Sequence, residues 1–186
     1  MDLDLSELSE PFRGMLASLS SVSPREEISL TQIPSPKGIA PESFALAAEI
    51  NHELASDHGV SRLVFCRDPQ QPEGWNSEFR IIGYAKSPIE TEMAKDDYLA
   101  SLPWEWLKDS LKQNGAQFAY EAGTTTTVLS TGHGTLISQP QHAEIEIRAS
   151  WAPVGFDLTP HLKGWIELLA LISGLPPKDS KVVRIG

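Results

Sequence analysis

Four side chains in this sequence combine useful binding chemistry with a suitable predicted position: Trp75, Arg80, Arg148 and His161. Arginine presents a planar fork of donors that suits carboxylate and phosphate groups, and both arginines lie within predicted strands. Trp75 lies in a predicted loop, where a large aromatic either folds back onto the core or anchors a partner. His161 lies in the first turn of a predicted helix, either partly exposed beside the N-cap or facing a ligand together with the two arginines.

Ordinary ion pairs would also explain the two arginines. Glu144 and Glu146 alternate with apolar residues in the same predicted strand as Arg148, so all three share its polar face. An arginine paired with such acids would stabilise a sheet surface and bind nothing else.

No sequence motif commits the chain to a reaction. The five histidines form no HExxH pattern, and Walker and GxSxG motifs are absent. The acids between residues 90 and 97 do not have EF-hand spacing, so we interpret them as a solvated connection rather than a cation site. Cys66, the single cysteine, lies in an apolar run and is predicted to be a small buried hydrophobe rather than a nucleophile. We therefore expect no cofactor and no metal, and a non-enzymatic role is favoured.

Composition narrows the classes of partner. The chain has 186 residues, which is typical of one domain, and a formal net charge of −10. Because an acidic surface repels phosphate backbones, direct binding to nucleic acid or to anionic lipid is disfavoured. No apolar stretch is long enough for a membrane helix, and acids at Asp2 and Asp4 argue against a secretory signal. These features predict a cytoplasmic protein.

Hydrophobic spacing predicts the elements that position these residues. Strict alternation over residues 143–151 indicates a strand with one buried face, which is typical of antiparallel sheets. The expected fold class is α+β, with a flexible lead over residues 1–8 and one domain over residues 9–186. Its expected order is α-β-α-β-β-α-β-β-β-α. Helices are predicted from Ser9, over 41–54, from Ser101 to Asn114 and from Thr159 to Gly174; strands are predicted over 26–33, 62–67, 78–86, 117–120, 124–130 and 143–151.

Several short segments together resemble a known family. They are Asp68-Pro69, Gly74-Trp75, Phe79-Arg80, Glu90-Thr91-Glu92-Met93, Trp104-Glu105-Trp106-Leu107, Gly123-Thr124, Ile147 to Pro153, and His161 with Trp165, Leu168-Leu169 and Gly174 to Pro177. In this order they resemble an actinobacterial family of uncharacterised proteins, the domain of unknown function numbered three thousand. The resemblance extends from about Pro11 to Val183 and implies a cytoplasmic bacterial protein without an assigned activity, cofactor or substrate.

Two functional hypotheses follow. The first is a non-enzymatic binding or adaptor module that recognises a protein partner through a half-exposed sheet and the loop tryptophan. The alternative is a protein or enzyme that binds a small anionic molecule in a pocket formed by Arg80, Arg148 and His161. This alternative requires the three side chains to converge.

Overall fold

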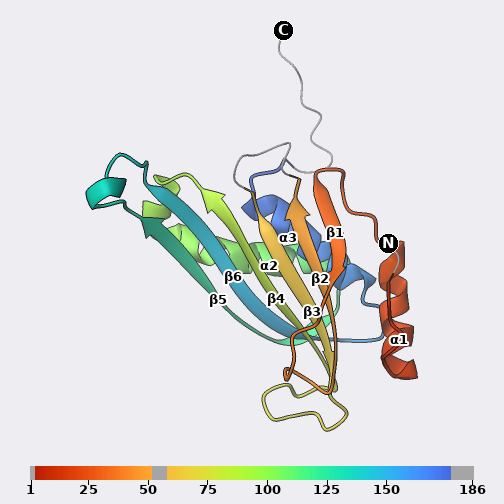
Figure 1. Cartoon of the computed structure of the whole chain (residues 1–186). Helices are drawn as coiled ribbons and strands as arrows, with labels where there is room; N and C mark the ends of the chain where they lie inside the picture. The colour runs from red at the N-terminus through yellow and green to blue at the C-terminus, as the bar shows by residue number, and fades with distance from the viewer. Residues whose placement is uncertain (1–2, 52–57, 177–186) are drawn as a thin grey trace.

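One six-stranded antiparallel sheet organises the chain (Figure 1). The computed structural model describes residues 3–51 and 58–176, and its strands run in the order β1-β2-β3-β4-β6-β5. Helices α2 and α3 lie together on one face of the sheet, which confirms the predicted single α+β domain with an antiparallel sheet packed by helices. The elements are α1 Glu10–Ala17, β1 Ile28–Ile33, β2 Glu42–Ile50, β3 Val60–Arg67, β4 Phe79–Ile89, α2 Leu102–Gln113, β5 Phe118–Ser130, β6 His142–Pro153 and α3 Thr159–Ile172.

The predicted helix over residues 41–54 is wrong, because Glu42–Ile50 forms strand β2. This strand lies between β1 and β3, and residues at its centre are buried on both faces. Leu46 points toward the helices, while Ala45 and Ala47 on the other face are also buried. A strand that is buried on both sides has no polar alternation, and its alanines are typical of a helix. The end of the predicted helix, from residue 52, lies outside the described residues.

Strand β5 joins two elements that the sequence predicted separately. The segments 117–120 and 124–130 form one strand, Phe118–Ser130, with a bulge between Ala119 and Ala122. Tyr120, within the bulge, has φ 55, a left-handed conformation that is uncommon for a residue other than glycine. The observed order is therefore α-β-β-β-β-α-β-β-α, in place of the predicted one.

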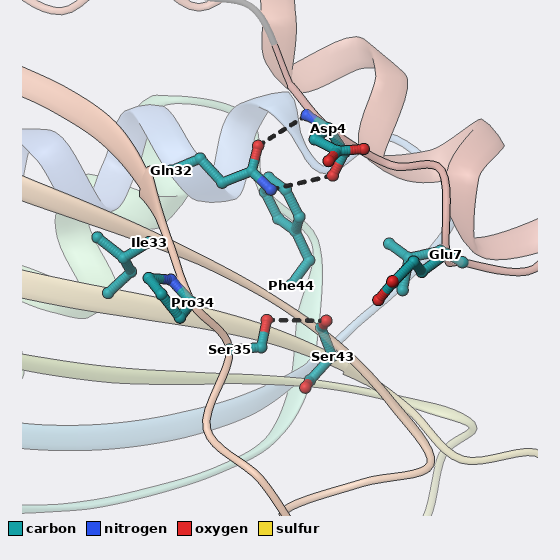
Figure 2. Close-up of a pocket in the computed structure, with 9 residues that line it drawn as sticks. Asp4, Glu7, Gln32, Ile33, Pro34, Ser35, Ser43 and Phe44 are labelled. Atoms are coloured by element: carbon teal, nitrogen blue, oxygen red, sulfur yellow. Dashed lines mark hydrogen bonds between the residues drawn. The ribbon is translucent and has the colours of Figure 1, made fainter.

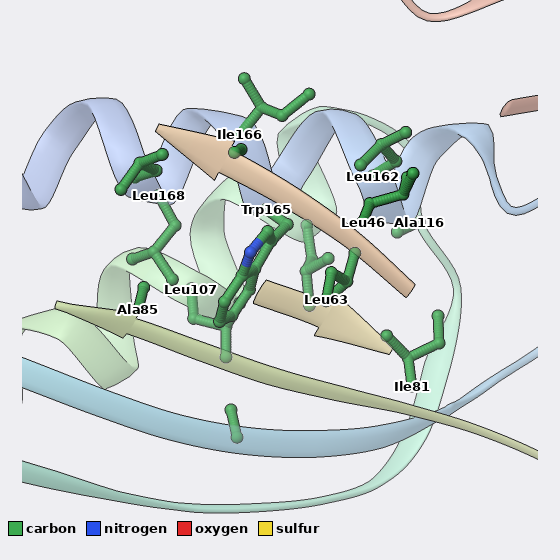
Figure 3. Packing of buried hydrophobic residues seen from close by; sticks show 14 of the residues in the cluster. Leu46, Leu63, Ile81, Ala85, Leu107, Ala116, Leu162, Trp165, Ile166 and Leu168 are labelled. Carbon is green, nitrogen blue, oxygen red and sulfur yellow. The ribbon is translucent and has the colours of Figure 1, made fainter. Parts of the chain in front are cut away.

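Helix α3 fills the centre of the core. Trp165 extends from it toward the strands and is 1% exposed (Figure 3). The helix ends as its sequence predicts: Gly174 has φ 69, and the N–H of Leu175 donates to the carbonyl of Ala170 at 2.9 Å.

Helix α2 lies close against α3. At Gly164 of α3, an added Cβ would lie 2.9 Å from the Cα of Leu111 on α2, so the two backbones approach closely at a residue without a side chain. The pair covers one side of the sheet and leaves the opposite side without a helix among the described residues (Figure 1).

The segment before α1 lies beside strand β1. The backbone N–H of Asp4 donates to Oε1 of Gln32 at 2.8 Å, and Nε2 of Gln32 donates to the Asp4 carbonyl at 2.9 Å. Leu3, Leu5 and Leu8 pack against the core. Residues 3–8 thus have specific contacts, whereas the flexibility predicted for residues 1–8 stays a prediction.

A charged cluster ties α1 to the end of the sheet. Glu42 accepts hydrogen bonds from the Ser9 N–H at 2.6 Å and from the Ser9 hydroxyl at 2.8 Å, and it pairs with Arg67 at 2.7 Å. Burial opposes ionisation of Glu42, but the bonds from Ser9 and Arg67 outweigh it and lower the pKa of the carboxyl. Arg67 also pairs with Glu78 at 2.6 Å.

Candidate binding surface

The side of the sheet without a helix carries two of the four predicted site residues. We call this side the open face and define it by Arg80, Ile82 and Tyr84 of β4 with Glu146, Arg148 and Ser150 of β6. The alternate residues of β4, such as Ile81 and Ala85, point toward Trp165 on the helix side (Figure 3). Arg80 and Arg148 therefore share one face.

His161 lies on the opposite side of the sheet. It is 1% exposed, and its Nδ1 accepts a hydrogen bond from Nε1 of Trp151 at 3.1 Å. Burial lowers the pKa of His161 to about 4, so the imidazole is neutral at pH 7. The three-residue pocket expected from the sequence is not formed, because the sheet separates this histidine from the two arginines.

Trp75 lies in the long connection between β3 and β4, away from the centre of the open face. Its side chain is half-buried, and its backbone N–H donates to the carbonyl of Pro72 at 3.0 Å. The role of Trp75 as an anchor for a partner stays a prediction.

Arg148 is the exposed arginine of the open face, with 63% of its side chain accessible. Its guanidinium lies over the Tyr84 ring at 5.3 Å and contacts Glu146 at 3.2 Å. Burial, followed by the charge of Glu146, raises the pKa of Tyr84, whose hydroxyl donates to the same carboxylate at 3.3 Å. The ion pair considered from the sequence is present, but solvent reaches it.

Arg80 differs from Arg148 because the fold encloses it. The residue is 5% exposed, and Nη2 donates to the Ser150 hydroxyl at 2.8 Å. Nη1 has no hydrogen-bond partner, and burial lowers the pKa of the guanidinium. Among the described residues, no carboxylate pairs with this side chain within 4.0 Å, in contrast to the expected ion pair.

A shallow hollow of about 480 Å³ lies on the open face over β4, β6 and β5. Register places Tyr84 opposite Arg148, and Arg148 opposite Thr124, so one row of polar side chains crosses it. The neighbouring row contains Ile82 and Ser150. The hollow therefore has an apolar floor and hydrogen-bonding groups at its side.

The outer edge of β5 is the second notable feature of this region. No backbone hydrogen bond joins that edge to any segment in the described part of the chain. Several large apolar side chains on β5 and on the connection to β6 are exposed beside it: Tyr120, Leu129, Leu136 and Ile137. Such a combination is typical of an interaction site rather than of a protected edge.

A larger cavity, of about 610 Å³, lies between the N-terminal segment and the start of the sheet (Figure 2). Its polar groups bond to one another: Gln32 bonds to the backbone of Asp4, and the Ser35 hydroxyl donates to the Ser43 carbonyl at 2.9 Å. Because this cavity offers few polar groups without partners, it is a weaker candidate than the open face.

The sequence also raised a thiol and a metal site as chemical candidates. Cys66 is buried, and its burial raises the pKa of the thiol to about 12, which confirms the predicted small hydrophobe. Within the described ranges, no group of three His, Cys, Asp or Glu residues is arranged to hold a metal ion. None of the described helices has the length and apolar character needed to span a membrane.

Sequence reasoning missed Tyr84, Ser150 and the β5 edge. Tyr84 follows Arg80 by four residues on one strand, so the period of two places both on one face once the strand is recognised. Ser150 lies on the polar face of β6, but its bond to Arg80 depends on tertiary packing. The four threonines at 124–127 signalled a strand, but an edge position depends on pairing order, which the sequence does not reveal.

Comparisons with known proteins agree with the motif resemblance. One protein-family model, described as a protein of unknown function, matches residues 8–183. Searches of curated proteins and of solved structures gave no match. This chain belongs to the family of proteins of unknown function designated DUF3000.

Proposed function

We propose that this chain is a non-enzymatic binding or adaptor module, and that its partner is a protein that adds an extended segment to the free edge of β5. The observation that carries the proposal is the composition of this edge. Over 13 residues, β5 contains no lysine, no arginine and no proline, and Glu121 is its single charge. Natural sheets usually protect exposed edges with charges, prolines or short strands.

The opposite edge of the same sheet is protected. Strand β1 has six residues, and Pro34 and Pro36 follow it closely. Gln32 on β1 bonds to both the N–H and the carbonyl of Asp4, so the N-terminal segment lies beside this strand. The contrast within one sheet supports β5 as the edge that receives a partner.

Strand addition suits the dimensions and chemistry of β5. An extended segment of matching length would span roughly 40 Å, and main-chain hydrogen bonds would supply affinity without requiring a particular sequence. The exposed side chains of Tyr120 and Leu129 would offer contacts for alternate residues of the incoming segment.

The net charge favours a different protein over a second copy of this chain. A formal charge of −10 makes two copies repel each other, whereas a neutral or basic segment does not experience this repulsion. We propose the cytoplasm as the compartment, because a chain with one buried cysteine folds without a disulfide and so does not need an oxidising environment.

The test combines affinity capture with a pair of matched variants. The wild-type chain and a Thr124→Lys/Thr126→Lys variant of β5 are immobilised and exposed to a native lysate. We expect the wild-type chain to retain a partner protein in a near-equal molar amount. The β5 variant should retain at least tenfold less of that partner, because lysines on an edge oppose strand addition. Hydrogen exchange on the purified complex should then show protection of the β5 amides.

Ser29→Lys/Thr31→Lys on β1 is the control, since it makes the same charge change at exposed positions of the other edge. This control should retain the partner. Equal loss in both variants, or a partner that protects amides away from β5, would contradict the proposal. Retention of a small molecule with no protein would favour the alternative function.

A further inference from the structure

We propose that the open face binds the carboxylate of an apolar acid over Ser150, beside Arg148 and with Arg80 behind the Ser150 hydroxyl. The site uses side chains on the face of the sheet, whereas strand addition uses the backbone at the outer edge of β5. Its apolar part would lie on the floor of the hollow, against Ile82 and the Tyr84 ring.

The enclosed guanidinium of Arg80 is the first observation. A buried charge without a counter-charge destabilises a fold, and an unsatisfied buried donor adds to that loss. Arg80 combines both, since it is 5% exposed, its Nη1 has no partner, and its bonds go to Ser150 alone. Ser150, which accepts the Arg80 bond, lines the hollow, so the uncompensated charge of Arg80 lies directly behind a group that a ligand can contact.

The other well-covered arginines show what a structural role looks like here. Arg25 has 8% of its side chain exposed and pairs with Glu27 at 2.7 Å. Arg67 has 15% exposed and pairs with two carboxylates. The fold therefore supplies acids to the arginines that it buries, and Arg80 is an exception among the described residues.

The position of Arg148 is the second observation. It lies two residues from Ser150 on β6, so both side chains point to the same face. Most of its side chain is in solvent, and its guanidinium contacts the Glu146 carboxylate at 3.2 Å and the Tyr84 ring at 5.3 Å. Because both contacts are exposed, the long side chain can turn toward a ligand. A carboxylate over Ser150 would then contact Arg148 directly and meet the charge of Arg80 through the Ser150 hydroxyl, because Arg80 does not itself line the hollow.

The charges favour a carboxylate over a phosphate. Glu146 already offsets part of the Arg148 charge, and the chain as a whole is strongly acidic. A singly charged group meets less repulsion from this field than a doubly charged one. The hydroxyl of Ser150 already accepts from Arg80, so its proton is available to donate to the carboxylate.

Hexanoate is the probe, and hexanamide is its uncharged match. Titration into the wild-type chain, followed by amide NMR shifts, should perturb residues around Ser150 with hexanoate and leave them unchanged with hexanamide. A short peptide ending in leucine, with either a free or an amidated C-terminus, distinguishes a peptide carboxylate from a free acid. Tighter binding of the free-terminus peptide would assign the site to peptides, and tighter binding of hexanoate would assign it to small acids.

Arg80→Met separates a binding role from a structural one. Binding of hexanoate should fall at least tenfold, whereas the Tm should stay within about 3 °C of wild type or rise, because methionine removes the unpaired buried charge. Arg148→Met should weaken binding less, and Lys112→Met on α2 is the control that removes one positive charge far from the open face.

Three results would overturn the inference. The first is that Arg80→Met unfolds or loses much more than 3 °C, which would make Arg80 a structural residue. The second is hexanoate binding that survives Arg80→Met. The third is that neither hexanoate nor the free-terminus peptide shifts the amide signals of the open face in the wild-type chain. This result needs no variant, and it would not contradict strand addition at β5.

Discussion

At the scale of single residues, the buried pair of His161 and Trp151 links acidity to stability. Nδ1 of His161 can accept the bond from the indole N–H while it carries no proton. In the unfolded chain this histidine has a pKa near 6.5, whereas burial lowers the value to about 4 in the fold. Between these values the unfolded chain takes up a proton and the folded chain does not.

The fold should therefore lose stability as the pH falls from about 6.5 toward 4, and this contribution should be fully present above 6.5. The gap between the two pKa values corresponds to at most about 3 kcal/mol. Urea unfolding followed by tryptophan fluorescence at pH 7 and pH 5 measures the loss. In His161→Gln, whose amide oxygen can accept the same bond without titrating, the difference between the two pH values should shrink. An unchanged pH dependence in this variant would show that carboxylates alone cause it.

At the scale of elements, the contact between β4 and α3 depends on one missing side chain. An added Cβ at Gly83 would lie 2.3 Å from Cη2 of Trp165, in a region where Trp165 is already packed against Trp151 at a ring distance of 6.0 Å. We expect Gly83→Ala to lower the free energy of unfolding by about 1–3 kcal/mol, because neither ring has space to move.

Gly14→Ala makes the same chemical change as Gly83→Ala, but it should raise the free energy of unfolding. Gly14 lies inside α1 with nothing within 4 Å of an added Cβ, so alanine should stabilise the helix by roughly 0.5–1 kcal/mol. Chemical denaturation of both variants measures the two effects. If Gly83→Ala were neutral, the packing of Trp165 against β4 would be looser than the structure indicates.

Elements exposed on one side could be predicted from the sequence, and elements covered on both sides could not. Strand β6 alternates strictly because its polar face meets solvent, and α3 carries clear start and stop residues. Strand β2 carries no such signal, since its centre is buried on both faces. For the same reason the candidate site was half predicted: Arg80 and Arg148 share a face, but the enclosure of Arg80 and the separation of His161 depend on tertiary packing.

At the scale of the whole molecule, the protein is strongly acidic, but its exposed edge strand β5 is nearly uncharged. The edge of β5 favours pairing with any extended chain, including another copy, whereas the formal charge of −10 opposes the approach of that copy. Charge repulsion between two molecules weakens when salt shortens its range, to about 10 Å at 0.1 M and about 3 Å at 1 M. Strand pairing itself does not depend on this repulsion.

Self-association should therefore increase with salt. We expect sedimentation velocity to show a monomer at low ionic strength and a weak, concentration-dependent dimer near 1 M sodium chloride. Thr124→Lys/Thr126→Lys should suppress this dimer, because the lysines obstruct the edge, while Ser29→Lys/Thr31→Lys should leave it unchanged. A tight dimer at low salt that the β5 lysines abolish would instead identify a second copy as the occupant of the edge, since the acidic charge would then have failed to keep the molecules apart.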